Sequence, residues 1–227
     1  MLRIENLTFQ YGDNEPLLQD VRFDFGDRGI VGIFGISGVG KTTLLKILAG
    51  LLYTPTGKVW WGDQDIMQLD KNALYAYRNT TIGFAFQDHH LLGHFTAREN
   101  IMLPFLFDDS QVDEWWIRHL TEYLSIMHLM DQRVSTISGG EKERVGIVKA
   151  LAHKPPILIL DEPGDSLHIE LRQKLYALIQ SYAQDNIVIL TSHSAELQES
   201  LQLAPIHYAD AIQFYRPLSD ALETPVE

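Results

Sequence analysis

The sequence of 227 residues contains no cysteine, which excludes a disulfide framework and any metal site built from thiolates. No stretch approaches the ~18 consecutive apolar residues of a membrane-spanning helix, so we expect any membrane association to depend on a partner. The first residues lack a basic segment followed by a long apolar one, and we therefore expect no signal peptide. Together these absences favour a cytoplasmic protein.

Basic residues are also scarce. Eighteen Lys and Arg stand against 30 Asp and Glu, which gives a formal charge of −12. Because an acidic surface repels phosphate backbones, we expect no direct contact with nucleic acid. The remaining composition, 45% hydrophobic and 21% charged, is that of an ordinary globular protein. The length suits one large α/β domain or a core with an inserted subdomain.

Glycines gather at residues 35–42, where GISGVGKT completes the pattern G-x-x-x-x-G-K-[ST]. Backbone amides can wrap a triphosphate only where side chains are absent, Lys41 adds a positive charge for the β- and γ-phosphates, and Thr42 adds a hydroxyl for Mg²⁺. The apolar run at 29–34 predicts a strand before this loop, and residues 41–50 predict a helix after it, whose N-terminus favours anions. The predicted phosphate site comprises Gly35, Ser37, Gly38, Val39, Gly40, Lys41, Thr42 and Thr43.

A second chemical motif follows the apolar run at residues 157–160, which predicts a buried strand ending at Asp161 and Glu162. Ligands of open α/β sheets lie at the carboxyl ends of the strands. Asp161 is therefore predicted to hold Mg²⁺ through its water shell. Glu162, pointing to the other side, is predicted to orient and deprotonate an attacking water. Two acids at a strand end can also simply cap the next segment, but the phosphate loop favours the catalytic interpretation.

The pattern along the rest of the chain predicts an α/β fold. Alternating or apolar residues predict further strands at 2–10, 21–25, 58–61, 81–86 and 187–190, and helical segments at about 167–182 and 195–201. Strands that alternate with helices indicate a mainly parallel, buried sheet. The predicted fold class is a P-loop NTPase core with this sheet, antiparallel strands near the N-terminus and an inserted helical subdomain.

Strand signals are weak between residues 88 and 150. Within this stretch, 111–130 carries apolar side chains at helical spacing, which predicts one amphipathic helix with a core-facing stripe of Trp116, Leu120, Tyr123, Leu124, Met127 and Met130. We therefore predict an α/β core from residues 1–87 and 151–217, with residues 88–150 as the inserted helical subdomain. The polar tail at 218–227 is expected to be frayed.

Residues 137–151, ISGGEKERVGIVKAL, resemble the signature motif of the ATP-binding cassette (ABC) ATPases, and they precede Asp161 as that family arranges it. The resemblance extends over about residues 1–215. Tyr11 is similar to the aromatic residue that stacks on adenine, Gln87 to the glutamine that links the Mg²⁺ site to a transmembrane partner, and His193 to the switch histidine that contacts the γ-phosphate. The resemblance thus implies Lys41, Gln87, Glu162 and His193 as catalytic residues, and Thr42, Gln87 and Asp161 as Mg²⁺ ligands.

The signature segment also has a physical interpretation. Ser138 and Glu141 form a Ser-x-x-Glu capping box, which by itself indicates only the start of a helix. Gly139 and Gly140 leave that helix N-terminus bare, so that its amides could meet a phosphate. In the family this phosphate belongs to ATP held by the opposite subunit. The resemblance therefore implies a dimer, most simply a homodimer, that closes head to tail around two nucleotides and parts on hydrolysis.

Residues 79–104 are similar to the lipoprotein-release, macrolide-efflux and cell-division branch of the family, although small-solute importers share much of this stretch. The implied function is hydrolysis of ATP to ADP and phosphate by the energy-supplying subunit of a membrane transporter, bound to transmembrane permease subunits at the inner face of the membrane. One alternative is an ATP-driven switch that signals to an extracytoplasmic enzyme. A less favoured alternative is a soluble ABC ATPase of translation or DNA repair, since the chain carries one cassette and no sustained heptads.

Three departures from the family pattern bear on activity. Glu141 replaces the commonest residue, glutamine, and should weaken nucleotide binding unless it folds back as the cap. Lys149 replaces arginine and loses its fork geometry. Residues 164–168 read GDSLH where the family usually has TSALD. His168 there replaces an acid, which puts communication across the dimer in doubt, with Asp165 as a candidate substitute.

Overall fold

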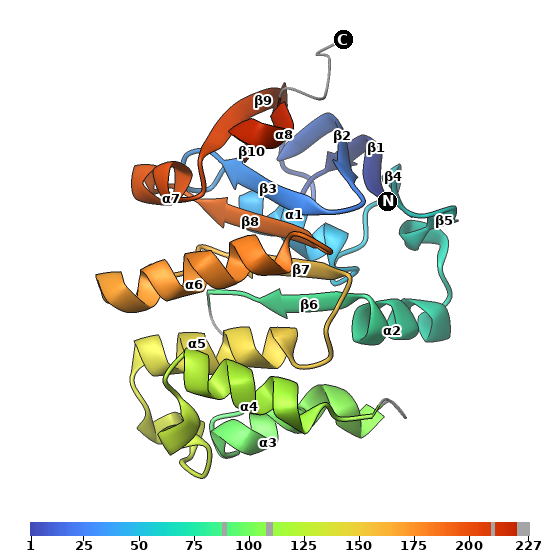
Figure 1. Cartoon of the computed structure of the whole chain (residues 1–227). Helices are drawn as coiled ribbons and strands as arrows, with labels where there is room; N and C mark the ends of the chain where they lie inside the picture. Colours follow the sequence, from blue (N-terminus) through green and yellow to red (C-terminus); the bar gives the residue numbers. More distant parts are fainter. Residues whose placement is uncertain (88–89, 108–110, 210–211, 222–227) are drawn as a thin grey trace.

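The computed structural model describes residues 1–87, 90–107, 111–209 and 212–221. Its larger sheet has six strands in the order β6-β7-β8-β3-β10-β9 (Figure 1). Strands β6, β7, β8 and β3 run parallel to one another, whereas β10 and β9 are antiparallel. The predicted mainly parallel sheet is therefore confirmed. The strand bounds are β3 (Gly29–Phe34), β6 (Ile82–Ala85), β7 (Ile157–Asp161), β8 (Ile187–Ser192), β9 (Leu203–Ala209) and β10 (Ile212–Pro217).

The second sheet is antiparallel and has the strand order β2-β1-β4-β5. It confirms the antiparallel strands predicted near the N-terminus. Strands β1, β2 and β4 pack in one hydrophobic cluster with α1 (Lys41–Leu48) and with one face of the larger sheet. Its strand bounds are β1 (Leu2–Phe9), β2 (Leu18–Gly26), β4 (Thr56–Trp61) and β5 (Gln64–Asp65).

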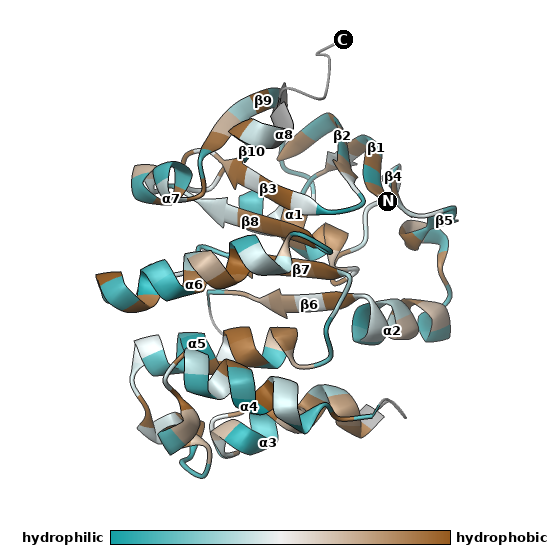
Figure 2. Cartoon of the chain, in the orientation of Figure 1, coloured by the Kyte–Doolittle hydropathy of each residue, from teal (hydrophilic) through white to brown (hydrophobic). Residues whose placement is uncertain are grey.

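Helices cover the opposite face of the larger sheet. Alternate residues of β7 divide between the two faces: Ile157 and Ile159 join the α1 cluster, while Leu158 and Leu160 face the helices. Figure 2 shows hydrophobic residues concentrated in the central strands and hydrophilic turns on α4, α6 and α7. These helices are α3 (Ala97–Met102), α4 (Glu114–Tyr123), α5 (Gly139–Leu151), α6 (Ile169–Tyr182) and α7 (Ala195–Ser200).

The helices α3, α4 and α5 lie between β6 and β7 in the chain, where the inserted helical subdomain was predicted. Their buried residues share one cluster with α6, α7 and the sheet. The division at residues 88 and 150 stays a prediction, and Asp88 itself lies outside the described residues. No helix in the described ranges is both long enough and apolar enough to cross a membrane.

The single helix predicted at 111–130 is wrong. Helix α4 starts after Asp113, whose side chain accepts a hydrogen bond from the Trp116 amide, and its last residue is Tyr123. Ser125 then takes a left-handed conformation (φ 56°), and the Ile126 amide donates to the Thr121 carbonyl. This is the hydrogen-bond pattern of a Schellman motif, which usually carries glycine at the left-handed position. Because serine and not glycine occupies this position, the sequence carries no signal for the turn, and the apolar residues on both sides of it look like one continuous helix.

Several elements were not predicted from the sequence. They are α2 (Lys71–Thr80), α3, the edge strand pair β9 and β10, and α8 (Leu218–Ala221). The last of these lies within the tail expected to be frayed, while residues 222–227 lie outside the described part, so fraying stays a prediction. Strand β9 contains Pro205, which argues against a strand in the sequence. Proline is tolerated in a sheet mainly at an edge, and β9 is an edge strand.

Candidate functional site

The glycine-rich loop lies between β3 and α1, as the sequence predicts. Gly38 (φ 81°) and Gly40 (φ 106°) adopt left-handed conformations that side chains disfavour. Gly40 is the N-cap of α1, and no described side chain caps that helix start. Within the described residues, the space where a Gly38 side chain would stand is open. The first amides of α1 therefore border open space, which is the arrangement of an anion site.

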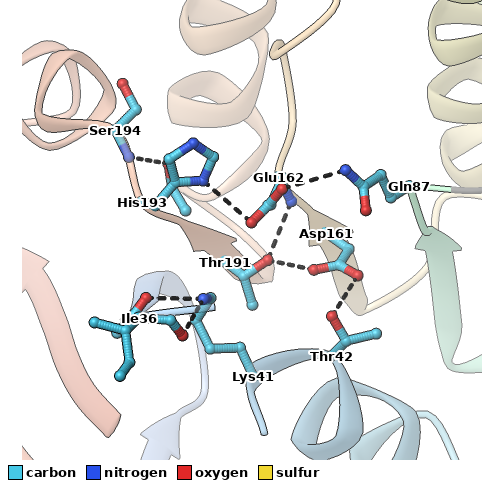
Figure 3. Close-up of polar contacts among 11 residues, drawn as sticks. Ile36, Lys41, Thr42, Gln87, Asp161, Glu162, Thr191, His193 and Ser194 are labelled. Carbon is cyan, nitrogen blue, oxygen red and sulfur yellow. Dashed lines mark hydrogen bonds and ion pairs between the residues drawn. The ribbon is translucent and has the colours of Figure 1, made fainter. Parts of the chain in front are cut away.

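Lys41 lies inside the loop rather than in solvent. Its residue surface is 7% exposed, and its Nζ donates hydrogen bonds to the carbonyl oxygens of Gly35 (2.8 Å) and Ile36 (3.1 Å) (Figure 3). The loop thus holds the ammonium group beside the start of α1. Together, the charge and the amides form one positive concavity suited to phosphate oxygens.

Asp161 ends β7 and connects three elements. One of its carboxylate oxygens accepts a hydrogen bond from the Thr42 hydroxyl of α1 at 2.8 Å, and the other accepts one from the Thr191 hydroxyl of β8 at 2.5 Å. These donor atoms are hydroxyl and carboxylate oxygens, the hard ligands that Mg²⁺ prefers, so the residues fit this ion. Sequence analysis missed Thr191. The signal was available in the strand pairing. The parallel strands β7 and β8 place Asp161 beside Thr191, two residues before His193.

Glu162 turns away from Asp161. Its backbone is left-handed (φ 53°), and its amide donates to the Thr191 carbonyl and hydroxyl oxygens at 3.2 and 3.1 Å. The two oxygens of its carboxylate lie 3.2 Å from His193 Nδ1 and 3.4 Å from Gln87 Nε2 (Figure 3). Thr191 therefore fixes the turn that sends the two acids in different directions, and His193 and Gln87 orient the second acid.

One cavity of about 720 Å³ joins most of the predicted site, a size typical of ligand pockets. Asp161 lines a smaller adjoining cavity of about 240 Å³ that also touches Gln87 and Glu162. Among the described residues, Ser138, Gly139 and Gly140 line neither cavity, and Val39 packs instead against the α1 cluster. The larger cavity is lined by Tyr11, Leu17, Ser37, Gly38, Gly40, Lys41, Thr42, Thr43, Gln87, Glu162 and His193.

Tyr11 lies at the rim of the larger cavity and is 48% exposed. Its ring packs edge-on against Phe9 with a centroid distance of 4.8 Å. Its hydroxyl lies 3.1 Å from the Thr43 hydroxyl. The structure thus brings this predicted base-stacking residue to the phosphate loop.

The start of α5 differs in its capping. Glu141 accepts hydrogen bonds from the Ser138 hydroxyl and amide, both at 2.7 Å, and the Ser138 hydroxyl accepts one from the Glu141 amide. The capping box is therefore complete, as expected if Glu141 folds back. Hydrogen bonds from the Ser138 side chain and backbone lower the pKa of Glu141. The carboxylate is thereby engaged within its own helix turn.

The two signature glycines have different surroundings. A side chain on Gly139 would meet no described atom within 4 Å, whereas one on Gly140 would approach the Ser166 carbonyl oxygen to 2.8 Å. Gly139 is thus the open position of the helix tip. Gly140 is required by the close contact of α5 with residue 166 of its own chain, which sequence analysis did not foresee.

The other departures also have defined places. Lys149 donates to the His90 carbonyl at 3.1 Å, and burial lowers the pKa of its ammonium group. His168 is the N-cap of α6, where none of the described side chains makes a capping hydrogen bond.

Ligand atoms of Asp165, Glu162 and His193 lie within 4.8 Å of one another. Desolvation and the nearby Glu162 charge raise the pKa of Asp165. Asp165 thus lies near the catalytic candidates Glu162 and His193, and its role as a substitute for the acid that His168 replaces stays a prediction.

Comparison with known proteins gives a consistent result. The sequence profile of the family described as "ABC transporter" matches residues 18–165, and one described as "AAA domain, putative AbiEii toxin, Type IV TA system" matches residues 143–198. The chain is 32% identical over 209 residues to the lipoprotein-releasing system ATP-binding protein LolD of Idiomarina loihiensis, covering 89% of this chain and 92% of that protein. It is 34% identical over 208 residues to LolD 1 of Rhodopirellula baltica, covering 88% and 91%.

Solved structures show the same likeness. The chain matches the dimeric structure of MJ0796, a bacterial ABC transporter cassette, with a TM-score of 0.81, 26% identity and coverage of 88% of this chain and 91% of that one. It also matches a dimeric post-hydrolysis state of the same cassette bound to ADP and Pi, with a TM-score of 0.78, 27% identity and the same coverage.

Proposed function

Because this chain belongs to the ABC transporter family, as the match over residues 18–165 shows, we propose that it powers a membrane transporter by ATP-driven dimerisation. ATP binding and hydrolysis are the activity of its family. The observation that carries the proposal is the cavity that joins the phosphate loop to Glu162 and His193, with the Asp161–Thr42 pair beside it. Binding groups, metal-binding oxygens and an oriented carboxylate thus lie together in one chain.

Each part of the proposed site has a distinct task. The amides at the start of α1 and the Lys41 ammonium bind the phosphates, and Tyr11 at the rim meets the base. Thr42 and Asp161 would hold Mg²⁺, with Gln87 as a further candidate ligand; when bound, the ion offsets negative charge on the phosphate oxygens. Glu162 accepts the proton of the attacking water, while His193 and Gln87 hold its carboxylate in place. Thr191 keeps Asp161 and Glu162 apart.

The site of one chain is incomplete by this account. Ser138 and Gly139 lie outside the cavity of their own chain, and the open side of Gly139 suits a phosphate held by a second copy. The dimeric form of the MJ0796 cassette supports this arrangement. A homodimer with two nucleotides between its subunits would then give each nucleotide a phosphate loop from one copy and a signature helix from the other.

The relatives named LolD, of the lipoprotein-releasing system, favour transport over signal relay. By analogy, the partners of this chain are transmembrane permease subunits, and its place is the cytoplasmic face of the membrane. The groove for the permease would lie near β6, where a cavity of about 360 Å³ is lined in part by Leu92, Leu103 and Lys149. Co-purification of the tagged chain with membrane proteins, lost after disruption of this groove by Leu103→Asp, would support the assignment.

The experiment that tests the proposed activity measures phosphate release from MgATP by the wild-type chain, the Lys41→Ala variant and a Lys71→Ala control. Lys71 is an exposed residue at the start of α2. We expect Lys41→Ala to lose at least ~100-fold in rate, as removal of one transition-state contact commonly does, and Lys71→Ala to match the wild type. Equal rates for all three chains would show that the phosphate loop does not carry the activity.

A further inference from the structure

The loop at residues 164–168, which joins β7 to α6, is held by side chains from two neighbouring helices. It contains the largest departure from the family pattern, GDSLH. It begins two residues after Glu162, and it touches the signature helix α5 on one side and α6 on the other. Its contacts therefore connect the nucleotide site of one chain with the signature helix that the same chain would offer to a second copy.

Glu143 of α5 holds the first side of this loop. One of its carboxylate oxygens accepts a hydrogen bond from the Gly164 amide, and the other accepts hydrogen bonds from the Ser166 amide and hydroxyl. The residue is only 8% exposed, so these charge-assisted hydrogen bonds are shielded from water. Glu143 also lines the small cavity, together with Glu162 and Asp165.

Gly140 brings the two backbones together at a second point. A Cβ atom at this position would lie 2.8 Å from the Ser166 carbonyl oxygen and 3.5 Å from the Leu167 side chain. The first turn of α5 therefore packs against Ser166, which Glu143 also contacts, and against the next residue, Leu167. Contacts one turn apart on α5 fix both the position and the tilt of the loop relative to the helix.

Arg172 of α6 holds the other side. Its guanidinium donates to the carbonyl oxygens of Gly164 at 3.1 Å and Leu167 at 3.0 Å. A further nitrogen forms an ion pair with Glu196 of α7 at 2.6 Å. Because α7 begins two residues after His193, these contacts connect the signature helix, the loop and the segment that carries His193.

We propose that Glu143 is a positioning residue that fixes loop 164–168 to the signature helix, so that both surfaces present one rigid unit to the second copy of the chain. The inference rests on the proposed dimer. Glu143 lines the small cavity beside Asp161 but no part of the large nucleotide cavity, so we expect its removal to leave nucleotide binding at the phosphate loop in place. What it changes is the alignment of Gly139 and the loop, on which closure of the dimer depends.

The test uses the Glu162→Gln background, in which we expect hydrolysis to be blocked and the ATP-bound dimer to accumulate. Added to it are Glu143→Ala, Glu143→Gln, Ser166→Ala and, as a control, Glu122→Ala, which removes an exposed carboxylate paired with Arg118 on α4. Light scattering after gel filtration gives the ATP concentration for half-maximal dimerisation. Titration with a fluorescent ADP analogue gives the nucleotide affinity of the monomer.

We expect Glu143→Ala to raise the half-maximal ATP concentration at least tenfold. Glu143→Gln and Ser166→Ala should raise it two- to fivefold, because each keeps part of the hydrogen-bond set, and Glu122→Ala should leave it unchanged. The ADP affinity should stay within twofold in all variants.

Dimerisation of Glu143→Ala at the ATP concentration of its parent would overturn the inference while leaving the proposed function intact. So would a parallel loss of ADP affinity, since that would indicate a general structural role. If Glu143→Ala does not fold, an unchanged Ser166→Ala would count against the inference by itself. Failure of the Glu162→Gln parent to dimerise would remove both the inference and the dimer on which it rests.

Discussion

The start of α1 and the start of α5 look alike in the sequence, since each places two glycines beside a helix N-terminus, but the structure uses them differently. At α1 the glycines adopt left-handed conformations and no described side chain caps the helix. At α5 the two glycines are the first helical residues, and the helix start carries a complete capping box from Ser138 and Glu141. The first amides of α1 are therefore not capped by a described side chain and can bind a ligand, whereas the start of α5 is capped by side chains of its own chain.

The contrast shows that glycine answers two separate needs. In the phosphate loop it supplies backbone conformations that other residues disfavour. In the signature helix it supplies space, toward open surroundings at Gly139 and toward the Ser166 carbonyl at Gly140. This difference supports the proposal that the nucleotide site is built within one chain around α1, while α5 offers its surface to a second copy.

The largest effect should come from Glu162→Gln, which separates nucleotide binding from chemistry. Replacing the general base should lower the rate of ATP hydrolysis by about 10²- to 10⁴-fold, with ATP binding retained because α1 and Lys41 are unchanged. Steady-state phosphate release and nucleotide titration measure the two quantities. Glu170→Gln, an exposed carboxylate at the start of α6, is the matched control. Hydrolysis by Glu162→Gln at the wild-type rate would refute the assignment of the base.

Thr191→Val should give the next largest effect, on stability as well as activity. It removes a buried hydroxyl that bonds both Asp161 and the Glu162 amide, and leaving such groups unsatisfied costs roughly 1–3 kcal/mol. Urea unfolding should show this loss. The control Thr80→Val, at the exposed end of α2, should change stability by less than about 0.5 kcal/mol. Equal stabilities of the two variants would argue against Thr191 as the link between the acids.

A pair of glycine substitutions tests the contrast between the two helix starts directly. Gly40→Ala should destabilise the chain by roughly 1–2 kcal/mol, because alanine disfavours the left-handed backbone and its methyl group would meet Leu17 and Leu18. Gly139→Ala should leave the monomer as stable or raise its stability by up to ~1 kcal/mol, as alanine favours a helix. Thermal unfolding measures the stability of both variants. A similar loss of stability in Gly40→Ala and Gly139→Ala would contradict the proposed difference between the two helix starts.

The smallest effect should come from Glu141→Gln, through the cap of α5. Since hydrogen bonds lower the pKa of Glu141 in the folded chain, its ionised form stabilises the fold at neutral pH. That contribution is lost as the pH falls through the folded-state pKa. The Tm difference between wild type and Glu141→Gln should therefore be small and positive at pH 7 and shrink toward pH 3. A difference that grows on acidification would contradict the cap.

Sequence reasoning succeeded where the local pattern and the chemistry agree. The phosphate loop, the strand before Asp161 and the strand before His193 were all placed, since each combines an apolar run with polar residues at its carboxyl end. The parallel sheet then brings Gln87, Glu162 and His193 to the same cavity. Their roles as ligands or catalysts stay predictions.

It failed where the structure depends on contacts distant in the chain. Thr191 carries no motif, and Glu143 lies in the signature segment without a role that the sequence assigns to it. The importance of Thr191 comes from strand pairing, and that of Glu143 comes from a loop that it contacts only after folding. The turn at Ser125 lacks the glycine that would have marked it. Strand β10 takes its place by pairing with β3, and β9, which contains Pro205, takes its place by pairing with β10.

Turnover measured against protein concentration tests the composite site most directly. At saturating MgATP, the rate per wild-type chain should rise with concentration and level off as the dimer forms, and light scattering on the same samples should show the dimer appearing in parallel. A rate per chain that stays constant down to dilutions where only monomer is detected would contradict the shared site.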